Sequence, residues 1–411
     1  MTARFPNLVQ PWLVNQLIEV FENGGENRLL AATADREVLP DNVRSYGLAE
    51  RCEYLPASSK TLLVHLLAEM FRKRGLMRVL RGISRLPRVF MSRRLGVRQK
   101  IDAILMLPYL GLSGIDVVHS HSEMMGTRAM PIVVALGVPL VITFHGLPPV
   151  GVKPISRKER ERYTAHAYAI LLNTEFAKRQ YVSIGASPEK IKILPQGLRM
   201  DDFPFKPREV HTGDALQVLS VGRFHPDKGQ SYSLEALQIL KASGHAVEWH
   251  MVGNGPDRER LEAQAVSLGV ADQVHFYSKL SDTELRGLYD QAQVFVLASV
   301  RSEDGFHEET QGVVLQEAQA SGLITIAAST GGIPECIDDG VSGFLVPDRS
   351  GKAIADKIAF VLEHKERWEA WQNAGRQWVE SRFEVGEIGR RTWQIYQDAI
   401  GEAPVGPVSE R

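Results

Sequence analysis

The sequence predicts an α/β protein built from two doubly wound parallel sheets with helices on both faces. Two observations favour this fold class. Short apolar strands alternate with helices through the second half of the chain, which is typical of parallel sheets with helical crossovers. The chain also has 411 residues, more than one ordinary domain holds, so two cores of about 200 residues each are expected.

The N-terminal domain is expected over residues 1–200, where the alternation is less regular. Its clearest strands are predicted at residues 116–119, 139–144 and 169–172. A doubly wound sheet normally opens with a strand, yet only MTAR precedes Phe5. The first strand is therefore either truncated, for example by a misassigned start, or missing from the centre of this sheet.

The C-terminal domain is expected over residues 201–384. The stretch 198–214 is charged, contains proline and lacks periodicity, so it predicts the domain boundary. The strands predicted beyond it are 216–221, 248–252, 273–277, 293–298, 324–328 and 343–346. A helix is expected over 385–400, followed by a flexible tail over 401–411.

Composition excludes some classes of partner and compartment. The formal net charge is −1, which argues against nucleic-acid binding. Cys52 and Cys336 cannot build a disulfide framework, which fits a reducing cytosol. The N-terminus lacks the ordered regions of a secretory signal, and Pro131 and Pro139 interrupt the longest apolar tract. A cytoplasmic protein without a membrane span is expected.

Two glutamates eight positions apart, Glu309 and Glu317, flank the start of a short predicted helix that opens at Gly312 and Val313. Carboxylates can bind vicinal hydroxyls, while helix N–H groups and the helix dipole attract phosphate. The arrangement therefore suits a nucleotide-diphosphate sugar, whose hydroxyl-bearing ends flank an anionic middle. Two solvated carboxylates on a surface helix are the alternative for the pair taken alone.

A basic turn follows the predicted strand at 216–221. It contains Gly222, Arg223 and Lys228, and an amphipathic helix begins after it. Arginine offers a planar bidentate fork and lysine a mobile point charge, so together they can neutralise a departing diphosphate. An ordinary exposed turn is the alternative for this motif alone.

Two glycine motifs complete the set. Gly253-Asn254-Gly255 follows the strand at 248–252, and glycine there lets the backbone approach a ligand closely. Gly331-Gly332 follows the strand at 324–328. Ligands of doubly wound sheets bind beyond the carboxyl ends of the strands. Because all of these motifs follow strand ends, a single binding site is predicted.

In order and spacing, these four motifs resemble those of the retaining glycosyltransferases of family 4. The resemblance is carried by Gly222…Gly229, Gly253…Pro256, Glu309…Glu317 and Gly331…Glu335, and it covers residues 100–350. It implies the GT-B architecture, in which two Rossmann-like domains face a deep cleft and a C-terminal helix crosses back to the N-terminal domain. Members in bacterial polysaccharide and lipid-linked glycan assembly are the most similar.

The resemblance implies transfer of a sugar from a UDP- or GDP-linked donor to a glycan or polyprenyl-linked acceptor, with retention and without a metal. The acceptor is expected on the N-terminal domain. Because the leaving diphosphate gains negative charge, Arg223, Lys228 and the helix start near Gly312 should stabilise it. Glu317 is expected to hold the ribose hydroxyls and Glu309 those of the transferred sugar. A double displacement with Glu309 as nucleophile is the alternative.

Several histidines lie at predicted strand ends of the N-terminal half. His119 and His121 fall on one face of an extended chain, which is compatible with metal ligation. No carboxylate or cysteine cluster completes a ligand set, so no metal is expected. His145 resembles the family's histidine that contacts the donor sugar across the cleft and is a catalytic candidate, and His121 is a candidate for a sugar or acceptor contact.

The segment from Phe71 to Lys100 holds eleven Lys and Arg side chains and no acidic one, with apolar residues interleaved. Such a basic amphipathic segment predicts peripheral contact with an anionic membrane, here the inner face of the cytoplasmic membrane. A groove for a polyanionic acceptor, a solvated helix face and nucleic-acid binding are the alternatives.

Two other function classes stay open at this point. The GT-B fold can also support nucleotide-sugar epimerisation, and a non-catalytic partner subunit could keep the fold around a degraded site. The set of Arg223, Lys228, Glu309 and Glu317 argues against a degraded site.

Overall fold

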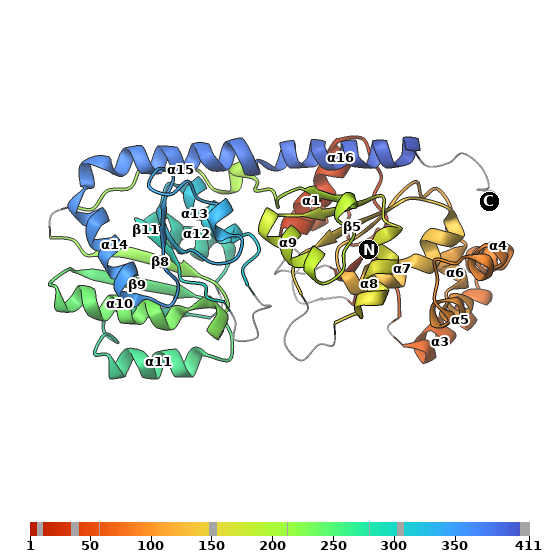
Figure 1. Cartoon of the computed structure of the whole chain (residues 1–411), viewed down its shortest axis with the longest axis horizontal. Coiled ribbons are helices and arrows are strands. Elements are labelled where there is room, and N and C mark those ends of the chain that lie inside the picture. Colours follow the sequence, from red (N-terminus) through yellow and green to blue (C-terminus); the bar gives the residue numbers. More distant parts are fainter. Residues whose placement is uncertain are drawn as a thin grey trace. The chain divides into compact units, whose positions relative to one another are not determined.

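The computed structural model describes residues 1–5, 11–33, 41–56, 58–147, 154–211, 213–278, 280–301 and 308–402. The chain divides into two compact units. Unit 1 combines Met1–Leu194 with Gly386–Arg411, and unit 2 is Pro195–Val385. Each unit contains parallel sheet with helices packed against it (Figure 1). The predicted α/β fold class is confirmed.

Unit 2 contains a six-stranded parallel sheet. Its strands are β8 (Leu216–Val221), β9 (Val247–Val252), β10 (Val274–Tyr277), β11 (Val294–Leu297), β12 (Ile324–Ala328) and β13 (Phe344–Val346). They lie in the order β10-β9-β8-β11-β12-β13, and every neighbouring pair is parallel. All six predicted strands are present, because each is a short apolar run bounded by turn residues.

Helices cover both faces of this sheet. They are α10 (Gln230–Ala242), α11 (Arg258–Ser267), α12 (Asp282–Gln291), α13 (Val313–Ser321), α14 (Gly351–Glu363) and α15 (Trp368–Phe383). Successive side chains of a strand point to opposite faces. Val294 and Val296 of β11 therefore pack in the cluster that contains α10 and α14, whereas Phe295 packs with α12 and α13.

Unit 1 contains two parallel sheets that meet at the first residue of the chain. One has β1 (Thr2–Arg4), β2 (Leu29–Thr33) and β3 (Cys52–Tyr54), and the other has β4 (Val118–Ser120), β5 (Leu140–Phe144), β6 (Ala169–Leu172) and β7 (Ile191–Ile193). The backbone N–H of His121 donates to the Met1 carbonyl at 2.9 Å. A first strand is thus present and is three residues long.

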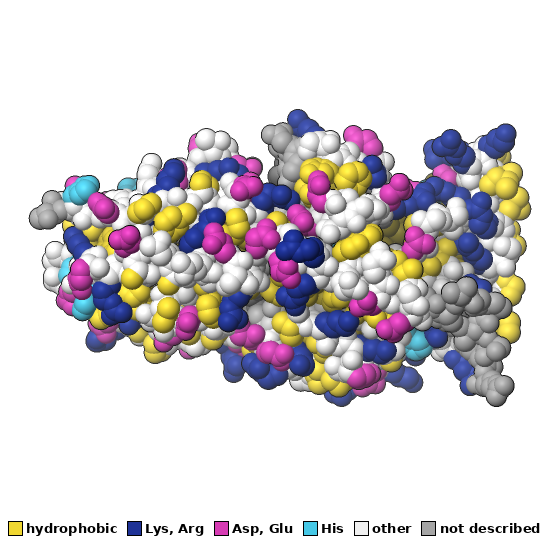
Figure 2. Space-filling model, turned by 90° about the horizontal axis from the view of Figure 1, so that it is seen from above, with side chains coloured by type: hydrophobic (Ala, Val, Ile, Leu, Met, Phe, Trp, Pro, Cys, Tyr) yellow, Lys and Arg dark blue, Asp and Glu magenta, His cyan; other side chains and the backbone are white. Residues whose placement is uncertain are grey.

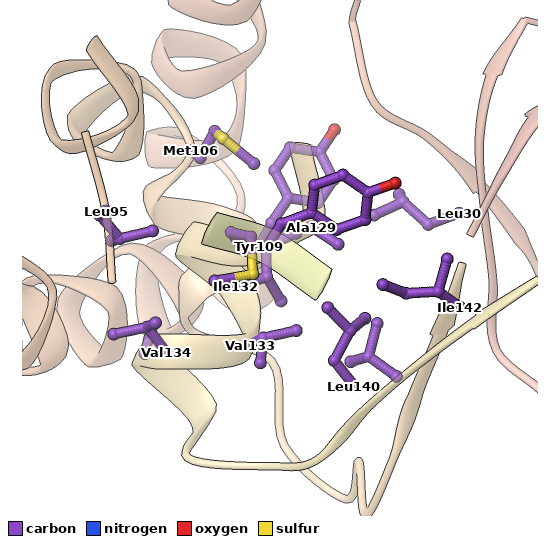
Figure 3. Packing of buried hydrophobic residues seen from close by; sticks show 14 of the residues in the cluster. Leu30, Leu95, Met106, Tyr109, Ala129, Ile132, Val133, Val134, Leu140 and Ile142 are labelled. Carbon is purple, nitrogen blue, oxygen red and sulfur yellow. The ribbon is translucent and has the colours of Figure 1, made fainter. Parts of the chain in front are cut away.

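The α-helices in the described part of residues 1–194 of unit 1 are α1 (Pro11–Glu22), α2 (Asp41–Ser45), α3 (Ser59–Met70), α4 (Lys73–Met91), α5 (Val97–Leu105), α6 (Leu107–Leu110), α7 (Glu123–Leu136), α8 (Arg157–Ala165) and α9 (Glu175–Ser183). Figure 3 shows part of the main hydrophobic cluster of this unit, in which Met106 and Tyr109 pack with α7 and β5.

Pro131 does not interrupt the apolar tract as the sequence suggested, because it lies inside α7. A proline within a helix leaves the carbonyl four residues earlier without its N–H donor. Here that carbonyl belongs to Thr127, and the side-chain amide of Gln99 donates to it at 2.9 Å. The side chain therefore replaces the missing backbone hydrogen bond, and the helix continues to Leu136.

The last helix, α16 (Val385–Glu402), belongs to unit 1 for nearly its whole length. Ile388, Ile395 and Tyr396 pack in a cluster with Val141 and Leu171 of the sheet. Residues 401 and 402, predicted to begin a flexible tail, are helical, and the rest of that tail lies outside the described residues. Among the described residues, no helix combines the length and the apolarity that a membrane crossing needs.

Candidate active site

The glycine motifs of unit 2 lie in two loops whose backbones touch. Gly222 follows β8 and Gly253 follows β9. A Cβ added to Gly253 would lie 1.9 Å from the Gly222 carbonyl oxygen, and one on Gly255 would lie 2.2 Å from that of Phe224. The Phe224 N–H donates to the Asn254 carbonyl at 3.1 Å. The packing of these two loops therefore requires glycine at residues 253 and 255, independently of any close approach of a ligand to the backbone.

Two further glycines connect this pair of loops to the next strands. A Cβ on Gly229 would lie 1.9 Å from the Ala298 carbonyl oxygen at the end of β11. One on Gly331, after β12, would lie 2.2 Å from the Glu309 carbonyl oxygen, and the Gly332 N–H donates to the same carbonyl at 2.8 Å. Backbone packing thus brings the loops after β8, β9, β11 and β12 together, as the sequence predicts.

Lys228 and Glu309 form an ion pair at this end of the sheet. About a fifth to a quarter of each side chain is exposed: 24% for Lys228 and 20% for Glu309. Burial by itself would raise the pKa of the Glu309 carboxyl, but Lys228, the Gly312 N–H and the Arg223 guanidinium outweigh it and hold that pKa below its usual value. Glu309 is therefore an ionised hydrogen-bond acceptor at neutral pH.

Helix α13 begins beside this ion pair. Gly312 occupies its N-cap in the left-handed region, with φ 70°, and has no side chain to cap the first N–H groups. Val313 is the first helical residue. The positive end of the helix dipole therefore lies next to Glu309 and contributes to a site for negative charge.

Glu317 lies further inside α13 and meets a different environment. Burial raises the pKa of its carboxyl to about 7, and the hydrogen bond from Tyr289 lowers it only in part. The Tyr289 hydroxyl donates to Glu317 Oε2 at 2.9 Å. Glu317 thus changes charge near neutral pH while Glu309 does not, so the two glutamates are chemically distinct.

Sequence reasoning missed two residues that support the site. Tyr289 on α12 orients Glu317 from a neighbouring helix, and it lies in none of the motifs named above. Glu308 accepts the Gly331 N–H at 3.1 Å and pairs with Arg301 at 2.8 Å, and its side chain is only 5% exposed. It positions the Gly331 loop against Glu309, and its place next to Glu309 in the sequence was the only available signal.

The candidate histidines lie in unit 1. The ring centroids of His119 and His121 are 4.1 Å apart, and those of His121 and His145 are 6.0 Å apart. His119 Nε2 bonds to Thr143 Oγ1 at 2.6 Å. Burial lowers the pKa of all three imidazoles, that of His145 to about 3, so each is neutral at physiological pH. In the described part of the chain no group of residues is arranged to hold a metal ion.

The basic segment of unit 1 is oriented differently from the sequence prediction. Several of its arginines point into the unit and not outward. Arg81 Nη1 donates to the Gly111 carbonyl at 3.0 Å, and Arg85 Nη1 donates to the Leu112 carbonyl at 2.7 Å. Arg78 pairs with a glutamate of β3 at 2.9 Å. Arg81 and Arg85 thus satisfy carbonyls just after α6, and the apolar side of α4 is left exposed.

Comparisons with known proteins now decide the family. The glycosyl transferases group 1 family matches residues 202–378, and Glycosyltransferase Family 4 matches residues 59–202. The chain is a GT-B glycosyltransferase of the family-4 type. The family match over 202–378 contains the loops after β8 and β9, the ion pair and α13.

Curated relatives are about 30% identical to this glycosyltransferase over the aligned residues. A GDP-mannose-dependent alpha-(1-6)-phosphatidylinositol monomannoside mannosyltransferase of Mycobacterium tuberculosis is 28% identical, over 56% of this chain and 62% of the relative. The putative colanic acid biosynthesis glycosyltransferase WcaL of Salmonella typhimurium is 31% identical, over 52% and 53%. The chain thus spans between half and two thirds of the length of these relatives.

Solved structures agree on the fold. Anabaena Alr3699/HepE in complex with UDP superposes with a TM-score of 0.68 at 16% identity, covering 97% of this chain and 99% of that one. Sucrose-phosphate synthase from Thermosynechococcus elongatus gives a TM-score of 0.67 at 17% identity, covering 96% and 94%. At this level of identity the likeness establishes the GT-B fold.

Proposed function

We propose that this glycosyltransferase transfers a sugar from a nucleotide-diphosphate sugar to a glycan or lipid-linked acceptor, in the synthesis of a cell-surface polysaccharide or glycolipid. The observation that carries the proposal is the Lys228–Glu309 ion pair among the packed glycine loops. It places a cation suited to a diphosphate beside a carboxylate suited to sugar hydroxyls, where ligands of such sheets bind. The name of the GDP-mannose-dependent relative and the UDP complex of the structural neighbour support this donor class, and the name of the colanic acid relative supports the role in polysaccharide synthesis.

Charge stabilisation is the main contribution that these residues make to the reaction. When the bond between the anomeric carbon and the donor phosphate breaks, negative charge grows on the diphosphate. Glu309 balances the charge of Lys228. The donor must therefore share this cation, and the growing charge draws Lys228 towards the leaving group. Arg223 and the start of α13 add to an effect that is larger in the transition state than in the ground state.

We assign the transfer to the retaining class without a metal. The acceptor oxygen bonds to the anomeric carbon on the face that the phosphate leaves, and a phosphate oxygen takes the acceptor's proton. Glu309 then serves as a hydrogen-bond acceptor for the sugar, because its ion pair with Lys228 makes it a weak nucleophile. His145 is neutral above about pH 3, so its expected contribution is a hydrogen bond to the sugar and not a proton.

The test is consumption of UDP- and GDP-sugars in the presence of a chelator. One donor should be hydrolysed or transferred, and Arg223→Ala and Lys228→Ala should each reduce turnover about 10²-fold or more. Arg260→Ala is the matched control, since this exposed arginine of unit 2 pairs with the nearby Asp257. Activity lost in chelator and restored by Mg²⁺ contradicts the metal-free scheme, and an epimerised donor identifies an epimerase.

A second part of the proposal concerns the membrane. Of the 19 exposed large hydrophobic side chains among the described residues, 14 lie between Leu63 and Ile104 on or beside α3, α4 and α5. Phe71 is 91% exposed and Met91 78%. We call these 14 side chains the three-helix face. Figure 2 shows hydrophobic side chains gathered at the right-hand edge of the view, with Lys and Arg side chains beside them. Apolar patches of this extent mark interaction sites.

We propose that the three-helix face docks on an anionic membrane, at the inner face of the cytoplasmic membrane. Exposed basic residues flank it at the ends of α4 and at the start of α5: Arg72, Lys73, Arg74, Arg93, Arg94 and Arg98. Each contributes roughly 1 kcal/mol near an anionic surface. A second copy of the chain on this face would bring like charges together, so a lipid surface is the better partner.

Vesicle co-sedimentation tests this contact. Met77→Gln with Met91→Gln should reduce binding to anionic vesicles by about tenfold or more, since every 1.4 kcal/mol of lost apolar burial is a factor of ten. Val266→Gln, at a 69% exposed apolar residue of unit 2, is the matched control. High salt should weaken wild-type binding. Equal binding of the double variant and wild type, or indifference to salt, contradicts the proposal.

A further inference from the structure

Unit 1 contains a cavity of about 920 Å³ that the proposed sugar transfer does not explain. It lies where α3, α5, α7 and α8 begin, and Ser58, Gly96, Met124 and Ser156 are among its lining residues. Its volume falls within the range of small-molecule sites, roughly 300–1,000 Å³. A cavity of this size, lined by both polar and apolar residues, is large enough for a lipid headgroup.

Positive charge dominates the lining of the cavity. Its charged residues are Arg98, Arg128, Lys158 and Arg162 against Asp102 and Glu159. Arg98 and Asp102 are 4.0 Å apart, with the Arg98 side chain 95% exposed, so that pair is weak. The helix starts around the cavity add partial positive charge of their own. An anion in this cavity would therefore be attracted from several sides.

One of the arginines is held by a hydrogen bond, and another lies against a glycine. Arg128 Nη2 donates to the Pro56 carbonyl at 2.6 Å, which fixes the guanidinium of this half-buried residue. Arg162 Nη1 lies 2.8 Å from the position that a Cβ on Gly96 would occupy. Only a glycine at residue 96 lets the Arg162 guanidinium sit against the start of α5. This places a cation at the positive end of a helix, an arrangement that an anionic ligand would stabilise.

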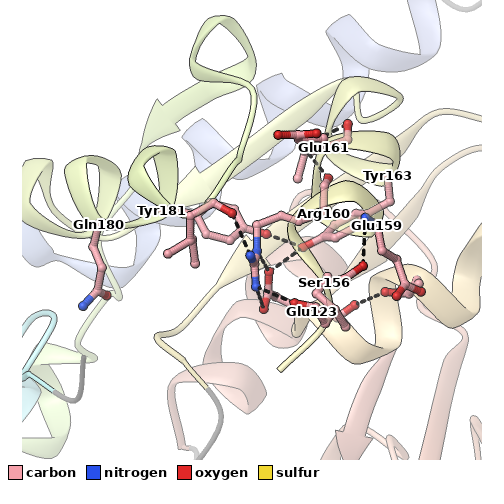
Figure 4. Close-up of polar contacts among 12 residues, drawn as sticks. Glu123, Ser156, Glu159, Arg160, Glu161, Tyr163, Gln180 and Tyr181 are labelled. Carbon is pink, nitrogen blue, oxygen red and sulfur yellow. Dashed lines mark hydrogen bonds and ion pairs between the residues drawn. The ribbon is translucent and has the colours of Figure 1, made fainter. Parts of the chain in front are cut away.

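The frame around the cavity is rigid. Glu123, the first residue of α7, is buried and forms a two-point ion pair with Arg160 of α8, with Oε2 and Nη2 3.0 Å apart (Figure 4). The Tyr163 hydroxyl donates to Glu123 Oε1 at 3.1 Å. On the other side, Gln99 of α5 donates to Thr127 of α7. These contacts fix three of the four helix starts relative to one another.

The cavity adjoins the three-helix face. Val97 lines the cavity and is 76% exposed, so it belongs to both surfaces. Ile101 and Ile104, further along α5, are exposed members of the same face. A ligand with its phosphate among the arginines could therefore continue along apolar side chains. That combination of an anionic head and an apolar tail is the chemistry of a phospholipid or of a lipid-linked sugar acceptor.

We propose that this cavity binds the phosphate-bearing head of a lipid-linked acceptor, with Arg128 and Arg162 as its principal phosphate contacts and the lipid chain along the three-helix face. The inference rests on the proposed function, since it names the acceptor class of the same enzyme. It also separates general membrane docking, which needs only the exposed face, from recognition of one lipid, which needs the cavity.

Vesicles that differ only in their anionic lipid test the proposal. Phosphatidylcholine vesicles carrying polyprenyl phosphate are compared with vesicles carrying phosphatidylglycerol at equal surface charge. The wild type should prefer polyprenyl phosphate about tenfold. Arg162→Gln should lose that preference, and so should Gly96→Val, which keeps every charge but displaces the guanidinium. Arg157→Gln is the control, since this exposed arginine of α8 does not line the cavity.

Three outcomes overturn the proposal: no preference in the wild type, a preference that both variants keep, or a preference that Arg157→Gln loses equally.

Inorganic pyrophosphate, titrated in a Lys228→Ala background, distinguishes a lipid from a free phosphate. If pyrophosphate displaces the protein from polyprenyl phosphate vesicles, the result supports phosphate binding in the cavity. If pyrophosphate binds but the protein shows no vesicle preference, the cavity is a site for a soluble phosphate, and the lipid assignment is contradicted. Donor hydrolysis should survive in both variants. If no donor is consumed but the vesicle preference is intact, the proposed transfer fails, and the cavity is a site for a lipid phosphate and not for an acceptor.

Discussion

The site of unit 2 and the cavity of unit 1 are built from different parts of the chain. In unit 2 the loops fit together through backbone: glycines lie where a Cβ would meet the carbonyls of Gly222, Phe224, Ala298 or Glu309. In unit 1 the helix starts are fixed by side chains, chiefly Glu123 with Arg160 and Gln99 with Thr127. A backbone-built site tolerates few substitutions at its glycines, whereas a side-chain-built cavity depends on a few charged pairs.

The largest expected effect lies in the charged frame of unit 1. Glu123→Ala should lower the free energy of unfolding by about 3–5 kcal/mol, because it leaves the Arg160 guanidinium buried without its carboxylate. Glu161→Ala on α8 is the control: its ion pair with Arg157 is more than half exposed, and its loss should change stability by less than about 1 kcal/mol. Denaturant unfolding measures both. Equal losses would mean that the buried pair does not hold this frame together.

Glycine substitutions in unit 2 should have the next largest effect. Gly253→Ala forces a Cβ to within 1.9 Å of the Gly222 carbonyl, so the loop must move at a cost of about 3 kcal/mol, the upper end for overpacking. Gly287→Ala, in the helix α12 with nothing within 4 Å, should instead stabilise by about 0.5–1 kcal/mol. Nucleotide affinity should fall only in the first variant. A neutral Gly253→Ala would show that the loop is not held by backbone contact.

The smallest effect is a pH dependence carried by Glu317. Burial raises the pKa of this carboxyl to about 7 in the folded protein, above its unfolded value of about 4.3. The folded state therefore binds the proton more tightly, and this group's contribution to stability falls as pH rises from about 4 to about 7. The ionised carboxylate is the better acceptor for ribose hydroxyls. Nucleotide affinity should therefore rise as the pH approaches about 7 from below, by up to tenfold per pH unit.

Two variants check this assignment by calorimetry across pH. Glu317→Gln should remove the Glu317-dependent part of the profile and leave only the titration of the nucleotide phosphates. Tyr289→Phe should shift the wild-type profile to higher pH, because the tyrosine hydrogen bond lowers the pKa of Glu317. Identical profiles for all three proteins would show that Glu317 does not contact the nucleotide.

The same contrast explains what could be predicted from the sequence. The strands and loops of unit 2 were predictable because Gly253, Gly255 and Gly331 are required by close backbone contact and leave a pattern in the chain. Lys228 and Glu309 are 81 positions apart. The sequence nevertheless predicted that they lie together, because both follow the carboxyl ends of strands in one parallel sheet. Their role in catalysis stays a prediction until activity is measured.

Other features left no such pattern. Arg128 and Arg162 reach the cavity from different helices, and neither lies in a motif. The amphipathic period of α4 was evident, but periodicity cannot say which side of a helix faces inward. The carbonyls of Gly111 and Leu112 decide that here, because they accept hydrogen bonds from Arg81 and Arg85. The continuation of α7 past Pro131 likewise depends on the hydrogen bond from Gln99. This is a tertiary contact, which the local sequence around Pro131 does not reveal.

The central claim is that unit 2 binds a nucleoside diphosphate through Lys228 without a metal. Thermal unfolding of the wild type and Lys228→Ala with UDP or GDP, in chelator, tests it most directly. At a hundredfold excess over Kd, a ligand specific to the folded state adds about 2.7 kcal/mol. We expect one nucleotide to stabilise the wild type to this extent and Lys228→Ala to lose most of the gain. No stabilisation by either nucleotide, stabilisation only after Mg²⁺ or Mn²⁺ is added, or equal stabilisation of the variant would contradict it.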